Sequence, residues 1–465
     1  MRSAAGLAAG TALAGCGGDG GDGGDGSSGS SGNGDSGGDS GSGSGGGGGA
    51  DTLSHLGHIT YAWPEQVETF EGLSDFEIDR TIVSYAAIQQ RLFSGGNETF
   101  DVAGFEGIIG RPALVFNDFS VGVSPDDLDT YTEWNEDNIA EVFTNPTERL
   151  DYLGAQAELL EEMVWSDPEE KTTLNMIPTN YNFDSVGYNP NYVEDGSVTT
   201  WSPMFDDAYQ GQVTLGTVPV ISVAETILHL MDNGMLDEDI DSVNNPSQDQ
   251  IDAATDFLID QSDAGQFRSL WGTTGQSAEL MASEEAVIGN IWQPAVFSVR
   301  ESGTPCRYAT LGEGIQGFAL TTGGFIPTKP GAQNNGTVDQ VKRWSEFHHG
   351  AWYADFVQKR TGYSVPHYPN DSLVRDGEDE TGSGMGPEFY DWAYQGKRTY
   401  DAIDEPALFQ PSNYEWSSEE GSPSSDGHKR DGGSIETRTD NVGTWYTWPD
   451  EGDYLSEQWT NFTGG

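Results

Sequence analysis

The alternation of hydrophobic and polar positions after residue 55 predicts strands and helices that follow one another along the chain. From Leu56, LGHITYAWPEQVETFEGLSDFEIDRTIVSY has the pattern of a short strand, a helix and a second strand. Another strand is predicted in NETFDVAGFEG, and TNPTERLDYLGAQAELLEEMVW has the apolar spacing of a helix. A β-α-β beginning of this kind favours an α/β fold.

The same alternation continues through the middle of the chain. SVAETILHLMDNGM predicts a helix that stops at Gly234, and SQDQIDAATDFLIDQSDAG predicts a second helix capped by Ser247. EEAVIGNIWQPAVFSVRESG predicts a buried strand followed by a helix, and VDQVKRWSEFHHGAWYADFVQKRTGY is strongly helical. Units of this length imply parallel or mixed sheets, in which ligands bind at the carboxyl ends of the strands.

The N-terminal segment has no globular pattern. LAAGTALAGC is too short to span a bilayer of about 30 Å but fits the apolar region of a secretion signal. Its end, Leu13-Ala14-Gly15-Cys16, resembles a lipobox, so we expect residues 1–16 to be a lipoprotein signal peptide with Cys16 lipidated. The alternative is a chance cysteine in a low-complexity leader. Residues 17–50, rich in Gly, Ser and Asp, predict a flexible tether.

The strongly negative charge of the chain argues against nucleic acid as a partner. The 465 residues include 76 acidic and 20 basic side chains, for a formal net charge of -56. Such a charge repels nucleic acid, and it destabilises the compact state unless salt screens it. The composition resembles that of proteins from halophiles, and we expect folding only at high salt. A polar stretch near residues 412–450 predicts an acidic surface insertion.

Motifs for catalysis or cofactor binding are weak. Gly312 to Gly317 matches G-x-G-x-x-G, but a strand follows it, which favours a turn. Asp237, Asp239 and Asp241 resemble part of a calcium loop that lacks its glycine and its final acid, so we expect a solvated acidic face. No nucleophile elbow, phosphate loop or zinc spacing is present in the sequence. We therefore expect no cofactor, no metal and no catalysis.

Several stretches together resemble the spermidine/putrescine-type solute-binding proteins of ABC importers. They are ITYAWPEQV and FDVAGFEG early in the chain, then DGSVTTWSPMFDDAYQGQVTLG, AELMASEEAVIGNIWQPAVFSVRESGTPCRYATLGEGIQGF, GFIPTKPGAQNN and TGYSVP. The resemblance covers about residues 56–370. It implies a type II periplasmic-binding-protein fold, in which each of two lobes is a mixed sheet flanked by helices.

The resemblance also implies how the chain is divided between the lobes. Lobe 1 would comprise residues 54–177 and 322–363, and lobe 2 residues 180–318 and 364–465. The chain would cross between them near residues 177–180, near 318–322 and after Tyr363. A ligand held in the cleft would favour closure by contacting both lobes.

The same resemblance implies a set of ligand-binding residues. They are Trp63, Gln66, Glu106, Trp292, Gln293, Thr322 and Tyr363. Polyamine binders place carboxylates at two further positions, where this chain has Val218 with Ile221 and Thr322. We therefore expect Glu106 alone to supply negative charge to the cleft.

These observations favour a lipid-anchored, extracytoplasmic and monomeric receptor of an ABC transporter, which delivers a small organic solute to a membrane permease. The alternative is a secreted, salt-adapted hydrolase that uses paired carboxylates. Ligand-induced closure without turnover would distinguish the first from the second.

Overall fold

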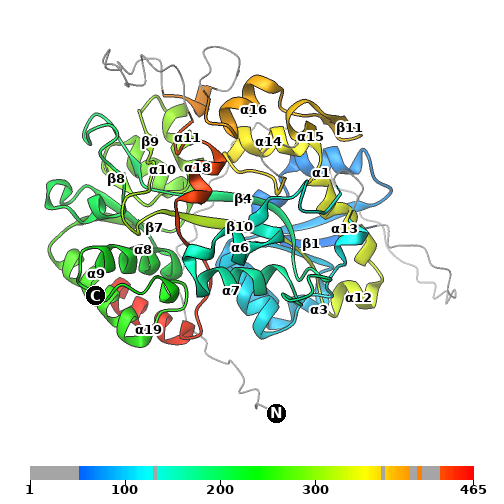
Figure 1. Cartoon of the computed structure of the whole chain (residues 1–465), viewed down its shortest axis with the longest axis horizontal. Helices are drawn as coiled ribbons and strands as arrows, with labels where there is room; N and C mark the ends of the chain where they lie inside the picture. The colour runs from blue at the N-terminus through cyan, green and yellow to red at the C-terminus, as the bar shows by residue number, and fades with distance from the viewer. Residues whose placement is uncertain (1–51, 129–132, 368–371, 398–405, 411–429, 465) are drawn as a thin grey trace, which may run out of the picture. The chain divides into compact units, whose positions relative to one another are not determined.

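The computed structural model describes residues 52–128, 133–367, 372–397, 406–410 and 430–464. The predicted lipidation site Cys16 and the predicted tether lie outside these residues, as does part of the stretch near 412–450. The predicted strands and helices form two mixed sheets with helices packed around them (Figure 1). This is an α/β fold, as the sequence predicts.

The first sheet has six strands in the order β13-β10-β3-β1-β2, with β4 also pairing β10. Its strands are β1 (Thr52–Gly57), β2 (Glu77–Ile82), β3 (Val102–Glu106), β4 (Ile177–Asp184), β10 (Phe318–Pro327) and β13 (Val442–Trp445). β1 runs parallel to β2 and β3, whereas β10 is antiparallel to β3 and β4. Parallel neighbours need crossover connections, and α1 (Pro64–Glu71) and α2 (Tyr85–Arg91) lie in them.

The second sheet has five strands in the order β7-β6-β8-β5-β9. They are β5 (Gly187–Tyr188), β6 (Val213–Gly216), β7 (Phe267–Trp271), β8 (Ile288–Gly289) and β9 (Arg307–Tyr308). A small hairpin of β11 (Glu378–Asp379) and β12 (Gly382–Ser383) stands apart from both sheets. The predicted strand in EEAVIGN is therefore much shorter than its apolar run, because only two of its residues pair.

The remaining α-helices cover these sheets. They are α3 (Asn97–Thr99), α4 (Gly107–Arg111), α5 (Glu141–Thr144), α6 (Pro146–Arg149), α7 (Ala155–Val164), α8 (Pro219–Asp232), α9 (Gln248–Asp263), α10 (Thr274–Ala282), α11 (Gln293–Glu301), α12 (Gly331–Asn335), α13 (Val338–Phe347), α14 (Ala351–Thr361), α15 (Ser372–Asp376), α16 (Pro387–Ala393), α18 (Ile435–Asp440) and α19 (Gly452–Gly464).

Local signals fix several helix ends where the sequence predicts them. Ser247 accepts a hydrogen bond from the Gln250 backbone, and the Gln250 side chain accepts one from the Ser247 backbone, which completes a capping box at α9. Gly234 follows α8 with a φ of 67°, a conformation that favours glycine. The segment from Gly312 to Gly317 is a turn before β10, so the expectation of a turn there is confirmed.

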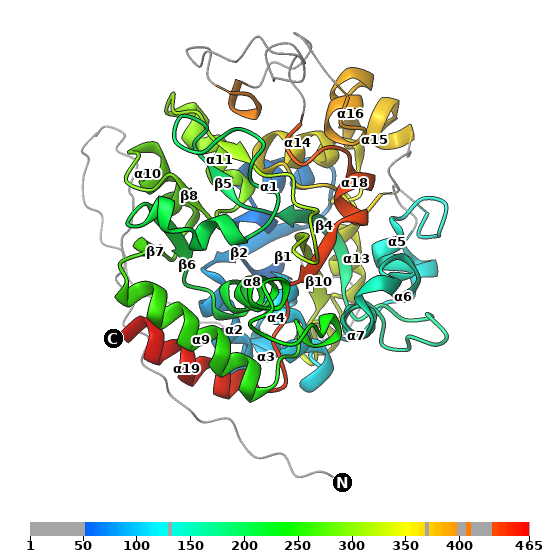
Figure 2. The same ribbon diagram turned by 60° about the vertical axis from the view of Figure 1, so that its left-hand side comes forward.

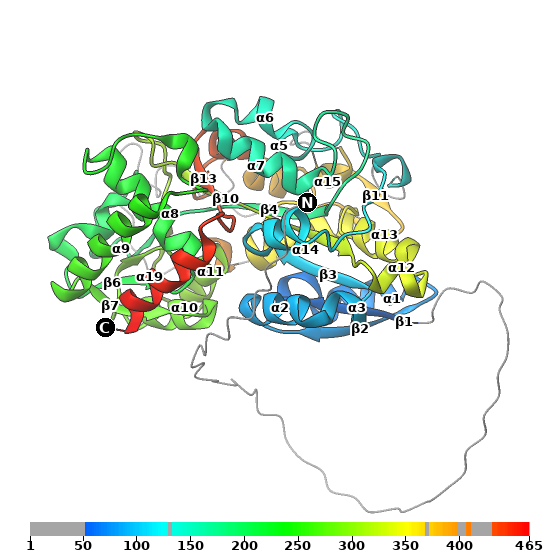
Figure 3. The ribbon, with the colours of Figure 1, turned by 90° about the horizontal axis from the view of Figure 1, so that it is seen from below.

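Two long strands connect the sheets. β4 of the first sheet is followed after two residues by β5 of the second, and β9 of the second leads back to β10 of the first. Ser364, which follows α14, forms an isolated antiparallel bridge to Tyr181 of β4, in which each backbone N–H donates to the carbonyl of the other at 2.8 and 2.9 Å. Figure 3 shows β4 and β10 running between the green and blue groups of elements.

The C-terminal part of the chain contributes to both sheets. β13 pairs in parallel with β10, although the sequence assigned residues 364–465 to the second lobe. α19 packs against α8 and α9, and Figure 2 shows α19 and α9 side by side. The hairpin and α15 pack against α14 instead. The last hundred residues are thus distributed over the whole fold.

Candidate functional site

The site begins with a polar row on β4. Asn180, Asn182 and Asp184 alternate with Tyr181 and Phe183, and all five residues are buried. Because successive strand residues point to opposite faces of a sheet, the three polar side chains share one face. A buried polar row is costly unless its groups find partners, so this face is a candidate binding surface.

The strand register brings a second carboxylate to that face. Gly323 of β10 pairs with Glu106 of β3 on one side and with Asn180 of β4 on the other. Thr321, two residues earlier on β10, pairs with Asn182. Residues paired directly across strands lie on the same face. Glu106 therefore shares the face of Asp184, and the two carboxylates interact electrostatically.

Glu106 lies at the end of β3 and is only 5% exposed. The Tyr85 hydroxyl donates to its Oε1 at 2.5 Å. Burial raises the pKa of Glu106 to about 8, and the nearby charge of Asp184 adds to the rise, while the Tyr85 hydrogen bond opposes it. At neutral pH this carboxyl group is consequently mostly protonated when no ligand is bound.

Asp184 lies at the end of β4 and accepts three hydrogen bonds. They come from the hydroxyls of Thr321 (3.0 Å) and Tyr308 (3.2 Å) and from the Asn182 amide (3.1 Å). Tyr308 belongs to β9, so this carboxylate contacts the second sheet as well as the first. Burial raises its pKa to about 6 even though all three donors lower it.

A third buried carboxylate, Glu225, comes from α8. The Tyr446 hydroxyl and the Asn290 amide each donate to it at 2.6 Å. Burial raises the pKa of Glu225 to about 8, and Asp184 contributes to this shift as well. Asp184 is thus electrostatically linked to both Glu106 and Glu225.

None of these three carboxylates has a charged partner among the described residues. Their hydrogen-bond donors are neutral hydroxyls and amides, and no described Lys, Arg or His forms an ion pair with Glu106, Asp184 or Glu225. A buried carboxylate without a counter-ion either takes up a proton or attracts a cation. We refer to Glu106, Asp184 and Glu225 as the carboxylate cluster.

Aromatic rings from both sides of the molecule meet beside this cluster. The Tyr85 ring, from α2, lies 6.3 Å from the Trp292 ring, which precedes α11. Trp292 in turn contacts Trp271 at 4.8 Å, and His58 stacks on Tyr85 at 4.4 Å. Edge-to-face and stacked rings of this kind present electron-rich faces that attract cations.

Three of the residues expected in the site are connected to the cluster. Glu106 is a member, and Trp292 reaches it through Tyr85. Tyr363 is 6% exposed and interacts electrostatically with both Glu106 and Asp184. Their role in binding a ligand stays a prediction.

Trp63 and Gln66 lie apart from these three. The Gln66 side chain accepts a hydrogen bond from the Trp63 backbone at 2.5 Å and caps the start of α1. The Trp63 ring packs against Phe356 at 5.7 Å, and the Arg360 guanidinium lies 5.4 Å from its centre. In this structure Trp63 thus contacts α14, and no contact joins it to Trp292.

Thr322 and Gln293 form no hydrogen bond to the carboxylate cluster in the described structure. Thr322 pairs with Tyr181 and therefore points to the face opposite Asp184, where its buried hydroxyl has no partner. Its neighbour Thr321 makes the contact with Asp184. Gln293 is buried and accepts a hydrogen bond from Arg430 at 3.5 Å.

The sequence analysis, which expected Glu106 alone to supply negative charge to the cleft, did not identify Asp184 and Glu225, which are also buried and electrostatically linked. The alternation of polar and aromatic residues in TNYNFD could have indicated Asp184, since a strand buried on both faces rarely carries such a row. Glu225 lies within a largely apolar helix, and no spacing rule distinguished it from the many other acidic residues.

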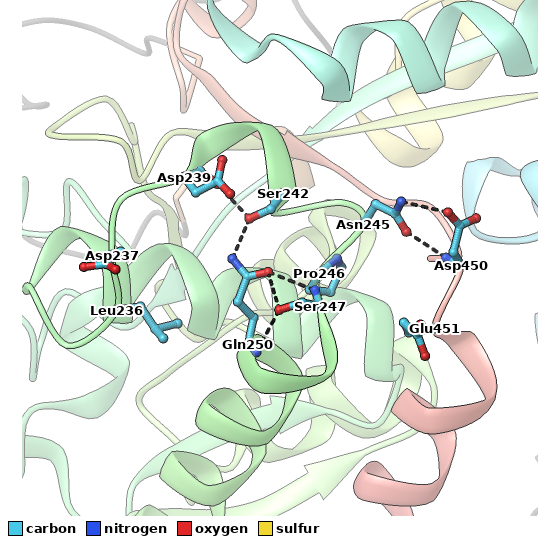
Figure 4. Close-up of a pocket in the computed structure, with 10 residues that line it drawn as sticks. All are labelled: Leu236, Asp237, Asp239, Ser242, Asn245, Pro246, Ser247, Gln250, Asp450 and Glu451. Atoms are coloured by element: carbon cyan, nitrogen blue, oxygen red, sulfur yellow. Dashed lines mark hydrogen bonds between the residues drawn. The ribbon is translucent and has the colours of Figure 1, made fainter.

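A separate acidic pocket opens beside α9 (Figure 4). Its volume is about 540 Å³, and its lining includes Asp237 and Asp239 of the stretch that resembles a calcium loop. Ser242 and Gln250 hydrogen bond to each other there at 2.6 Å. The described residues contain no group of three or more His, Cys, Asp or Glu side chains placed to hold a metal ion.

The fold defined by these two sheets is that of type II periplasmic binding proteins. The structure is similar to that of a spermidine/putrescine ABC transporter substrate-binding protein from Streptococcus pneumoniae, with a TM-score of 0.55 and 15% sequence identity. The match covers 89% of this chain and 99% of the other. A lipoprotein of Treponema pallidum matches with the same coverage and TM-score at 12% identity. The binding protein MotA from A. tumefaciens, in complex with glucopine, covers 88% of this chain and 99% of its own, with a TM-score of 0.52 and 12% identity.

The matches above are matches of structure, and comparison of the sequence alone finds none. No family model matches the chain, and no curated protein does. Within the described ranges, none of the helices combines the length and hydropathy required to cross a bilayer.

Proposed function

We propose that this chain is the substrate-binding protein of an ABC transporter and that its ligand is a small organic cation. The carboxylate cluster is the observation that carries this proposal. Glu106, Asp184 and Glu225 are buried, electrostatically linked and without a basic partner in the described chain. A ligand with one or more ammonium groups would supply the missing positive charge.

The surroundings of the cluster favour an alkylammonium ligand. Tyr85 and Trp292 offer aromatic faces, which bury alkyl groups and attract ammonium groups at the same time. More than one carboxylate favours more than one positive charge, so the ligand class would be diamines or polyamines. Spermidine and putrescine appear in the names of structurally similar proteins, which supports this class.

Residues from both sheets would hold the ligand. Glu106 belongs to β3 of the first sheet and Tyr85 to α2, which packs against β1, whereas Glu225 and Trp292 flank the second sheet. A cation bound among them would interact with both sides, and this is the requirement for a ligand to favour lobe closure. β4 and β10 would be the crossing strands between the lobes.

The cellular setting is part of the proposal. Lipidation at Cys16 would hold the protein outside the cytoplasmic membrane, and the tether would let it reach the permease. It would act as a monomer, deliver the solute to the permease and perform no catalysis. The acidic surface would repel phosphate-rich partners.

Isothermal titration calorimetry tests this function directly. We expect single-site binding of 1,4-diaminobutane or spermidine, and much weaker binding of 1,4-butanediol, which has the length of the diamine without its charge. Equal affinities for diamine and diol would contradict a cation site. Mass spectrometry should recover the ligand unchanged, whereas release of a product would favour the hydrolase alternative.

A further inference from the structure

Two arginines near the C-terminus are buried without a carboxylate partner. Arg430 and Arg438 are 4% and 1% exposed, and neither forms an ion pair within the described part of the chain. Arg438 donates from Nε to the Ser434 carbonyl at 3.2 Å and from Nη2 to the Ala393 carbonyl at 3.3 Å. Carbonyl oxygens satisfy these N–H groups but do not neutralise the charge.

Arg430 is held in a similar way. Its Nη2 donates to the Gly362 carbonyl at 2.6 Å, and its Nη1 donates to the backbone carbonyl of Asp431 at 3.2 Å. The Asp431 carboxylate itself bonds to Arg300 and Arg307. That carboxylate is therefore shared by two other guanidinium groups, and it acts on Arg430 only through space.

Two buried hydrogen-bonding groups in this part of the described chain have no partner. The Nε of Arg430 and the hydroxyl of Tyr181 are both buried and have no partner in the described structure. Tyr181 interacts electrostatically with Arg438 and Arg430, and the two arginines interact with each other. The Arg438 guanidinium also lies 4.9 Å from the centre of the Phe183 ring, which is 5.8 Å from the Tyr181 ring.

Two buried like charges without a counter-ion are strongly unfavourable. Burial lowers the pKa of Arg430 to about 10, and the effect of Asp431 opposes this shift, so the group stays protonated at neutral pH. Burial also lowers the pKa of Arg438, and the charge of Arg430 adds to that shift. An added negative charge would relieve both costs, and the two unused donors would bind it.

We propose that a small monovalent anion, a halide or a simple carboxylate, binds among Arg430, Arg438 and Tyr181. Tyr181 and Asp184 point to opposite faces of β4 because they are three positions apart, an odd number, on the strand. The anion site is therefore distinct from the carboxylate cluster. Since β4 connects the two sheets, the bound anion would stabilise the region where the chain crosses between them.

Thermal unfolding of the full chain tests the proposal without added solute. Chloride would replace a bulky sulfonate anion such as 2-(N-morpholino)ethanesulfonate at constant ionic strength and pH. We expect the unfolding midpoint to rise by about 3 °C at saturation, with a similar rise for acetate if the site takes carboxylates. Arg430→Gln should abolish the rise, and Tyr181→Phe should weaken it.

Arg111→Gln is the matched control. Arg111 is also buried, but it forms an ion pair with Asp450 at 3.0 Å, so the chloride response of this variant should equal that of the parent protein. The proposal would be overturned if an anion raised the unfolding midpoint equally in the parent protein and in Arg430→Gln. It would also be overturned if neither chloride nor acetate raised the midpoint of either protein. If Arg430→Gln does not fold, bromide soaked into crystals of the parent protein decides the matter. An anomalous peak beside Arg430 Nε supports the site, and its absence overturns it.

This inference and the proposed function can fail separately. Glu106→Gln should weaken binding of a diamine and leave the chloride response intact. Arg430→Gln should abolish the chloride response, and the diamine should still bind. If the parent protein did not bind a diamine, the proposed function would be contradicted and the anion site would not be affected.

Discussion

The two faces of β4 adjoin buried acidic groups on one side and buried basic groups on the other, and neither set has a charged partner among the described residues. On one face Asp184 joins Glu106 and Glu225, whose partners are all neutral. On the other face Tyr181 lies near Arg430 and Arg438, whose bonds go to carbonyl oxygens. The molecule therefore keeps three buried acids and two buried bases apart at its centre.

Elsewhere the same chain pairs its buried arginines. Arg300 and Arg307 share Asp431, and Arg111 pairs with Asp450. With 76 acidic residues for 20 basic ones, carboxylates are not scarce. Both proposals above depend on this difference, because they assign a bound ion to the buried charges that have no charged partner among the described residues. Four predictions test this comparison, beginning with the largest expected effect.

The stability of the ligand-free protein should have an optimum between acid and neutral pH. Burial raises the pKa of Glu106 and of Glu225 to about 8. The unfolded chain loses these protons near pH 4.5 and the folded chain does not, so the free energy of unfolding falls as pH rises from 4.5 to 8. Each group contributes about 1.4 kcal/mol per pH unit.

The acid limit of that optimum has another origin. Burial lowers the pKa of His55, His348 and His349 to about 3. Below pH 6.5 the unfolded chain binds protons that the folded chain excludes, so stability falls as pH falls from 6.5 to 3. Urea unfolding across pH measures both limits. Glu106→Gln should flatten the alkaline side and steepen the fall in stability between pH 6.5 and 4.5, because it removes the opposing contribution of Glu106 there. An unchanged alkaline slope would contradict the assignment.

Neutral replacements in the cluster should weaken cation binding by about 100-fold, because each removes a buried charge partner. Glu106→Gln and Asp184→Asn keep the shape of the side chain and lose its charge. Calorimetric titration with spermidine measures the change. Glu285→Gln, an exposed carboxylate paired with Arg268, is the control and should bind as the parent does. Parent-like affinity in both cluster variants would remove these residues from the site.

Cation binding should release protons, since bound ammonium groups favour ionised carboxylates. Affinity should increase by about tenfold from pH 6.5 to pH 7.5 if one proton leaves. Titration in buffers that differ in ionisation enthalpy counts the protons released. Glu106→Gln should reduce that number. Affinity independent of pH over this range would contradict the raised pKa of Glu106.

Trp292 should have the smallest effect. Trp292→Leu removes an aromatic face, and we expect affinity to fall about threefold to tenfold. The change in tryptophan fluorescence on binding should also decrease. Trp63→Phe is the comparison, because the Trp63 ring packs against Phe356 away from the cluster. A larger loss from Trp63→Phe than from Trp292→Leu would reverse this assignment.

Much of the fold could be predicted from the sequence. The helix α8 and the cap at Ser247 follow from local patterns, which depend on residues close together in the chain. The pairing of β13 with β10 could not be predicted, because more than a hundred residues separate the two strands. The shortness of β8 also depends on its neighbours rather than on its own apolar run.

The candidate site was predictable only in part. Glu106 and Trp292 follow from the resemblance to known binding proteins, whereas Asp184 and Glu225 were missed. In a chain with so many acidic residues, a carboxylate becomes distinctive only when its burial is known. Burial is a property of tertiary packing, and single-sequence patterns do not report it for a polar residue.

The placement of the final residues has a consequence for how the protein is made. β13 completes an edge of the first sheet, α19 covers α8 and α9, and the Tyr446 hydroxyl holds Glu225. A ribosome that stops before residue 442 would release a chain with an unfinished sheet and an unsupported acid. The first sheet and the hydrogen bond to Glu225 can therefore be completed only after the residues from β13 to α19 have been synthesised.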